Sequence, residues 1–183
     1  MLPRDGDRAT HLTRVDDYDK NTVPTGWTGF DDGDGGTGGT QGILSTAPDS
    51  FFNESLAVTP DSDPNDQVYY SAARDIYQVL AEPLEPNSTY LLTVDIGDRD
   101  RPGGEGSPGN PGLRLGMGAI PGEGLLESVA TRFTPQIDGE WVTWSATYET
   151  GPNPPGRGEP LRIELTSGSQ VGWFDKVRLT VTR

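Results

Sequence analysis

Asp175 is the residue whose type and position first raise a chemical question. It lies in the segment QVGWFDKVRL, residues 170–179 of a chain of 183 residues. The two-residue period of a β-strand puts six residues on one face: Val171, Trp173, Asp175, Val177, Leu179 and Val181. A carboxylate in such an apolar row needs a hydrogen-bonding partner or must leave the row. Two interpretations are open: a β-bulge shifts the phase so that Phe174 packs inward, or Asp175 stays inward and accepts hydrogen bonds from backbone amides.

Most other catalytic chemistry is disfavoured by the residue types present. The sequence has no cysteine, which excludes disulfides, zinc–thiolate sites and cysteine nucleophiles, and its single histidine, His11, argues against a Ser-His-Asp triad. The 28 acidic residues could supply a carboxylate pair for glycosidic chemistry, but no spacing selects one pair. No glycine-rich loop ends in the GK[ST] of a phosphate-binding loop. We therefore expect a protein without enzymatic activity.

Aromatic residues are the candidates for binding a ligand. In EWVTWSATYET, residues 140–150, alternation places Val142 inward and Trp141 outward. An outward tryptophan on a sandwich can stack against a sugar ring or anchor an interface, and it can equally be a strand-end residue covered by a loop. Tyr69 and Tyr70 would extend the same binding edge. The expected ligand-binding residues are therefore Trp141, Tyr69 and Tyr70.

The elements that must position these residues are short strands. TYLLTVDIG, residues 89–97, alternates clearly, and PLRIELTSG, residues 160–168, puts Leu161 inward and Arg162 and Glu164 outward. The 25 glycines and 16 prolines indicate long connecting loops, such as residues 98–112. Strands without intervening helices predict an all-β fold, an antiparallel jelly-roll sandwich of roughly eight strands.

Several segments together resemble a known group of domains. PTGWTGF, YQVLAEPLEPNSTYLLTVDIGDR, WVTWSATY and GEPLRIELTSGSQVGWFDKVRL follow one another in an order similar to that of galactose-binding-like jelly-roll sandwiches. These domains occur in secreted bacterial proteins and carbohydrate-binding modules. The resemblance runs from Thr22 to Val181, and it is more specific for fold than for function.

The resemblance also implies a third interpretation of Asp175. In related carbohydrate-binding sandwiches, an aspartate of the last strand helps to bind a structural calcium ion, together with an acidic residue of the first strand. The corresponding ligands here would be Asp175 with Asp16 or Asp17, completed by backbone carbonyls. Calcium accepts six to eight oxygen ligands in irregular geometry, which suits such a set.

Charge and patterning limit the partners. The net charge of −14 opposes broad binding to nucleic acid, and no apolar stretch approaches the 18 residues of a membrane span. The start of the chain lacks the apolar region of a signal peptide. We read residues 1–21 as an N-terminal arm and 22–183 as the jelly-roll domain.

These features favour a non-catalytic structural protein at a virion surface, such as a capsid cement, decoration, tail or fibre protein. Its partners would be capsid or tail subunits and further copies of the chain in a homo-oligomer. The alternative is a carbohydrate-binding module of a secreted bacterial protein, which would be extracellular and bind a glycan.

Overall fold

The computed structural model describes residues 19–20, 23–30, 40–45, 67–72, 74–97, 111–130, 141–167 and 171–183. The regular secondary structure of these residues consists of eleven strands. The strands are β1 (Asp19–Lys20), β2 (Thr28–Phe30), β3 (Thr40–Ser45), β4 (Gln67–Ala72), β5 (Asp75–Pro83), β6 (Thr89–Gly97), β7 (Gly112–Met117), β8 (Leu125–Ala130), β9 (Trp141–Glu149), β10 (Pro160–Thr166) and β11 (Val171–Thr182). Within the described ranges, no helix is long and apolar enough to cross a membrane.

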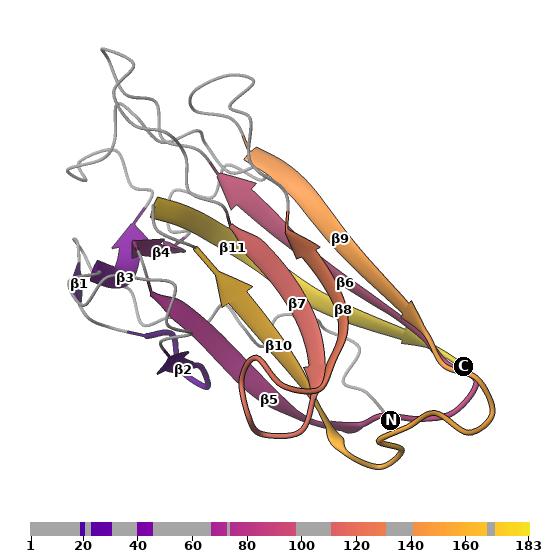
Figure 1. Ribbon diagram of the computed structural model, residues 1–183. Helices are drawn as coiled ribbons and strands as arrows, with labels where there is room; N and C mark the ends of the chain where they lie inside the picture. The colour runs from indigo at the N-terminus through magenta and orange to yellow at the C-terminus, as the bar shows by residue number, and fades with distance from the viewer. Residues whose placement is uncertain are drawn as a thin grey trace.

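The strands form two antiparallel sheets that pack face to face as a sandwich (Figure 1). Sheet A has six strands in the order β1-β3-β4-β11-β6-β9, and sheet B has five in the order β2-β5-β10-β7-β8. The expected all-β antiparallel sandwich is therefore confirmed, with eleven strands where roughly eight were expected. The difference comes partly from β1 and β2, which have two and three residues.

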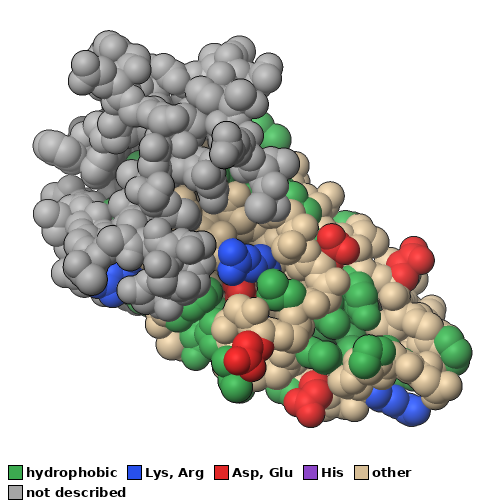
Figure 2. Space-filling view, viewed as in Figure 1, with side chains coloured by type: hydrophobic (Ala, Val, Ile, Leu, Met, Phe, Trp, Pro, Cys, Tyr) green, Lys and Arg blue, Asp and Glu red, His purple; other side chains and the backbone are tan. Residues whose placement is uncertain are grey.

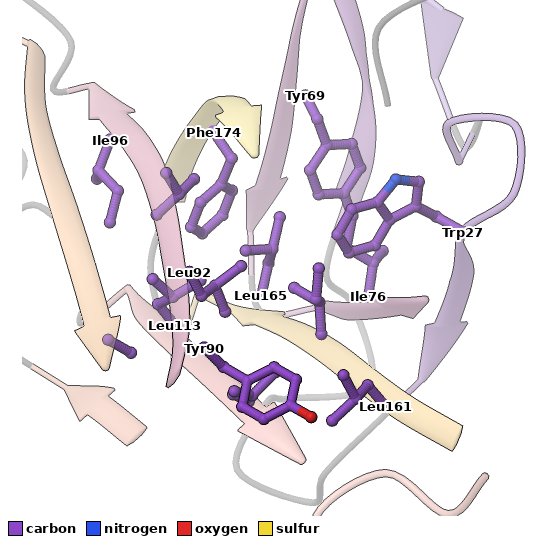
Figure 3. Packing of buried hydrophobic residues seen from close by; sticks show 14 of the residues in the cluster. Trp27, Tyr69, Ile76, Tyr90, Leu92, Ile96, Leu113, Leu161, Leu165 and Phe174 are labelled. Carbon is purple, nitrogen blue, oxygen red and sulfur yellow. The ribbon is translucent and has the colours of Figure 1, made fainter. Parts of the chain in front are cut away.

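The core lies between the two sheets and follows the expected alternation. Tyr90, Leu92, Val94 and Ile96 of β6 are each at most 1% exposed. Side chains from both sheets meet there, as Figure 3 shows for Leu92 of sheet A and the residues around it. Burial of these apolar side chains is the main force that holds the two sheets together.

A β-bulge in β11 changes which of its residues face the core. The register with β6 shifts between Asp175 and Arg178, and Lys176 at the bulge has a φ of 49°. Phe174 before the bulge packs in the core, and Val177 after it packs against the core. An extra residue in one strand reverses the phase of the strand beyond it. The bulge interpretation of Asp175 is therefore confirmed.

The outward face of β10 is also buried, which alternation alone did not indicate. Arg162 is 0% exposed, and its guanidinium donates to the carbonyl oxygens of Met117 at 2.9 Å and Gly118 at 2.7 Å. It also donates to the carbonyl oxygen of Glu123. Its Nε donates to Glu164 Oε1 at 2.7 Å, and Glu164 is 0% exposed as well. The β7–β8 loop thus lies over this face of sheet B.

Both members of the Arg162–Glu164 ion pair bind the β7–β8 loop. The Gly122 amide donates to Glu164 Oε1 at 2.8 Å, so the carboxylate binds the loop as well as Arg162. Gly116 allows the guanidinium to lie across β7, because a Cβ there would stand 2.8 Å from Arg162 Nη2. A buried ion pair of this kind is stable only when its remaining donors and acceptors are satisfied. Here the loop backbone satisfies most of them.

Candidate functional site

The face of sheet A turned away from the core carries a buried pair of carboxylates. Asp175 of β11 pairs with Asp95 of β6 in the antiparallel register, and the two residues are 5% and 7% exposed. The preceding pair, Phe174 and Ile96, points the opposite way, into the core. The bulge after Asp175 allows the strand to present an acid here and still present Val177 to the core.

Neighbouring residues hold both carboxylates in place through hydrogen bonds and an ion pair. Asp175 Oδ1 accepts a hydrogen bond from the Lys176 backbone amide at 2.7 Å. Asp95 Oδ2 lies 4.0 Å from Lys176 Nζ, and Asp95 Oδ1 accepts a hydrogen bond from the Thr143 hydroxyl. Thr143 of β9 is the register partner of Asp95. We call Asp175, Asp95 and Thr143 the carboxylate row, because they lie side by side across β11, β6 and β9.

A second row lies one strand step away on the same face. Tyr70 of β4 pairs with Trp173 of β11, and their ring centroids are 5.5 Å apart with an interplanar angle of 36°. Trp173 pairs in turn with Gly97 of β6, and Gly97 pairs with Trp141 of β9. We call Tyr70, Trp173, Gly97 and Trp141 the aromatic row. Tyr70 and Trp173 are 4% and 3% exposed, although they face away from the core.

The structure separates the two expected tyrosines. Tyr69 is a core residue: its ring stacks on Phe174 at 6.3 Å, and its hydroxyl donates to Gln41 Oε1 at 3.2 Å. Burial raises the pKa of the Tyr69 phenol above its usual value. Tyr70 is on the opposite face, in the aromatic row. Trp141 is the first residue of β9, and its place in the row follows from the backbone register.

The expected calcium ligands are only partly within the described residues. Asp175 is described, whereas Asp16 and Asp17 lie outside the described residues. No cluster of three or more acidic, histidine or cysteine residues occurs in the described ranges. Next to Asp175, these ranges offer the Asp95 carboxylate together with the Lys176 ammonium. The described residues alone therefore do not fit the six to eight oxygens of a calcium site.

The sequence alone does not identify four residues of this site: Asp95, Thr143, Lys176 and Trp173. Alternation did put Asp95 and Thr143 on outward phases, and that is the signal that could have identified them. What the sequence does not contain is the register, which brings β6, β9 and β11 together in sheet A. The rows exist only after these strands pair.

Comparison with known proteins decides between the classes of function. The sequence profile of the HpiC1-like family, described as HpiC1 cyclase, matches residues 9–180. The chain belongs to the HpiC1-like cyclase family. No curated protein is significantly similar in sequence.

Two solved structures are similar to this cyclase over most of its length. One is the Stig cyclase Fisc from Fischerella sp. TAU in complex with (3Z)-3-(1-methyl-2-pyrrolidinylidene)-3H-indole. It has 25% sequence identity and a TM-score of 0.71, and the match covers 90% of this chain and 88% of that one. The other is an apo cyclase from Fischerella sp., with 25% identity, a TM-score of 0.73 and coverage of 97% and 92%.

Family membership corrects the expected function. The prediction of a non-catalytic protein was wrong, because the chain belongs to a family of cyclases. The expected virion-surface or extracellular location and the capsid, tail, homo-oligomeric or glycan partners rested on that prediction, and the family supports none of them. Sequence spacing selects no carboxylate pair, because it is the sheet register, and not the spacing along the chain, that brings Asp95 and Asp175 together.

Proposed function

We propose that this cyclase closes a ring in a small aromatic substrate of the indole class, with Asp175 as the proton donor. The substrate class rests on the related Stig cyclase from Fischerella, whose structure holds an indole compound. The observation that carries the assignment of Asp175 is its pairing with Asp95, more than nine-tenths buried, beside the aromatic row.

The two carboxylates have different surroundings, and this suggests different roles. Asp95 interacts through one oxygen with the Thr143 hydroxyl and through the other with the Lys176 ammonium. Asp175 lies in the same strand as Trp173 and on the same face, two residues away. We assign proton transfer to Asp175 because it adjoins the residues that would hold an aromatic substrate. Asp95 and Lys176 would position it.

The proposed reaction needs no reagent other than the substrate and the Asp175 carboxyl group. The Asp175 carboxyl group gives its proton to an unsaturated carbon of the substrate side chain, and a carbocation forms. The electron-rich indole carbon attacks that cation and closes the ring. Loss of a proton to the Asp175 carboxylate restores aromaticity and the acid, so the product is an isomer of the substrate. The faces of Trp173 and Tyr70 would stabilise the cation, and exclusion of water would prevent its hydrolysis.

Three predictions from the sequence remain proposals. Residues 1–21 would be an arm and 22–183 the domain; Asp19 and Lys20 of the arm pair with β3. A structural calcium ion on Asp175 would need Asp16 or Asp17 as well, and we derive no step through it. We also retain the galactose-binding-like jelly roll as a proposed relationship of the fold, without a sugar ligand.

Product analysis tests the proposed function. The purified protein is incubated with a panel of indoles that carry an alkenyl side chain at C3, and the products are separated by liquid chromatography with mass detection. We expect at least one substrate to give an isomer of unchanged mass that the heat-denatured protein does not form. Comparable cyclisation of matched alkenyl benzenes would contradict the indole assignment. Formation of no isomer from any indole would contradict the proposed reaction.

A further inference from the structure

Thr143 is the member of the carboxylate row that lies at the surface. It is exposed, whereas Asp95 and Asp175 are 7% and 5% exposed. Its strand, β9, is at the edge of sheet A, and along that edge Figure 2 shows mainly tan atoms, which are backbone and side chains that are neither apolar nor charged. The Thr143 hydroxyl donates a hydrogen bond to Asp95 Oδ1. An exposed residue thus holds a buried acid.

A chain of contacts leads from Thr143 to Asp175. Asp95 accepts the Thr143 hydrogen bond through Oδ1, and its Oδ2 lies 4.0 Å from Lys176 Nζ. The backbone amide of Lys176 in turn donates to Asp175 Oδ1 at 2.7 Å. Lys176 therefore interacts with both acids, with Asp95 through its side chain and with Asp175 through its main chain. The chain of contacts ends at the group that we assign as the proton donor.

The Thr143 hydroxyl restrains the rotation of the Asp95 carboxylate. The terminal torsion of an aspartate is broad, so a carboxylate without such a partner turns easily. The hydrogen bond from β9 holds Oδ1, and it thereby keeps Oδ2 directed toward the Lys176 ammonium of β11. Hydrogen bonds to charged groups are among the stronger ones in proteins. Valine at position 143 would keep the branched shape of threonine and lose this restraint.

We infer that Thr143 is a positioning residue of the cyclase: it orients Asp95, and through Asp95 and Lys176 it fixes the place of the Asp175 carboxyl group. The inference rests on the proposed function, because it takes Asp175 to be the proton donor. Thr143 does not touch the substrate in this arrangement. Its loss therefore slows the reaction and leaves substrate binding unchanged.

The kinetics of Thr143 variants test this inference on an alkenyl indole that the wild type converts. Thr143→Val should lower the turnover number by about tenfold, the factor that a hydrogen bond to a charged group is worth at the least. The Michaelis constant should stay within about twofold, because the lost interaction is not with the substrate. Thr143→Ser keeps the hydroxyl and should restore the turnover number. Thr147→Val is the matched control, because Thr147 is exposed on the same face of β9 and pairs with Leu91 instead of an acid. It should react at the wild-type rate.

A double variant tests the route through Asp95. In an Asp95→Ala background, adding Thr143→Val should change the turnover number by less than about twofold, because residues that act through one another are not additive. The same loss as in the wild-type background would overturn this route.

The outcomes separate the two proposals. A wild-type turnover number in Thr143→Val, or a Thr143→Ser variant as slow as Thr143→Val, would overturn the role of the Thr143 hydroxyl and leave the proposed function intact. A wild type that forms no isomer from any alkenyl indole would overturn the proposed function, and the role of Thr143 with it.

Discussion

Asp95 and Asp175 face each other across β6 and β11, immediately before the bulge that returns β11 to the core phase. Without the bulge, alternation would place either the acid or Val177, Leu179 and Val181 on the wrong face. One inserted residue thus lets a single strand contribute both to the site and to the core. This is why a carboxylate can stand in a strand that also supplies Phe174, Val177, Leu179 and Val181 to the core.

Lys176 has the unusual backbone conformation that the bulge requires, which leads to a first prediction. Its φ of 49° costs a non-glycine residue about 1–2 kcal/mol. Lys176→Gly should therefore leave the free energy of unfolding unchanged or raise it, and it should lower the cyclase rate by removing the ammonium near Asp95. Urea unfolding and the rate of isomer formation measure the two effects.

A β-branched residue provides the control for Lys176. Lys176→Val also removes the ammonium, but valine fits poorly at positive φ, so this variant should be less stable than Lys176→Gly. Equal stability of the two variants would show that the strand adopts another conformation at this position.

The ion pair on the outer face of sheet B gives a second prediction. Arg162→Ala would leave Glu164 buried without its main partner and would release three backbone carbonyls, so it should destabilise the protein by about 3–5 kcal/mol. Arg114→Ala is the matched control, because Arg114 lies 3.7 Å from Glu164 and is partly exposed. It should cost about 1 kcal/mol or less. Urea unfolding measures the stability of both variants. Similar losses of stability would contradict the assignment of Arg162 as the main partner of Glu164.

Tyr69 gives a third prediction, for alkaline pH. Burial raises the pKa of its phenol, so the folded protein keeps this proton at pH values where the unfolded chain has lost it. Its contribution to stability is therefore complete below about pH 10, the ordinary pKa of tyrosine, and declines as the pH rises further. As the pH rises above about 10, the free energy of unfolding should fall more steeply in the wild type than in Tyr69→Phe. Parallel curves would contradict this role.

The sequence predicted the fold better than it predicted the site. Alternation in residues 89–97 identified the buried residues of β6, because each strand's periodicity is a local property. The same rule misassigned Val142, which is 41% exposed near the start of the edge strand β9. It also placed Arg162 outward without indicating that a loop covers it. Coverage and register depend on residues distant in the chain.

The candidate site depends on strand register even more than the fold does. Asp175 was conspicuous because it broke an apolar pattern, and its bulge was one of the stated interpretations. Asp95, Thr143 and Gly97 broke no pattern, since polar and small residues are ordinary on an outward phase. Their relation to Asp175 and Trp173 depends on which strands are neighbours in sheet A. That order joins β6 to β11 and to β9, which are not consecutive in the chain.

The carboxylate pair gives a fourth prediction, on the separate roles of its members. Asp95→Asn keeps the size of the side chain and can still contact Thr143, but it removes the charge that faces Lys176. We expect a smaller loss of rate than in Asp175→Asn, with little change in the Michaelis constant, because Asp95 does not touch the substrate in our proposal. Rates and Michaelis constants for both variants are the measurement. A larger loss of rate in Asp95→Asn would reverse the assignment of the two acids.

The most direct test of the account is the cyclisation rate of Asp175→Asn on an alkenyl indole that the wild type converts. A side chain that cannot donate the proton should slow isomer formation by about 10²- to 10⁴-fold. Asp175→Glu should retain more activity than Asp175→Asn, and indole should bind all three proteins. A folded Asp175→Asn protein that forms the isomer at the wild-type rate would contradict the proposal that Asp175 is the acid of this cyclase.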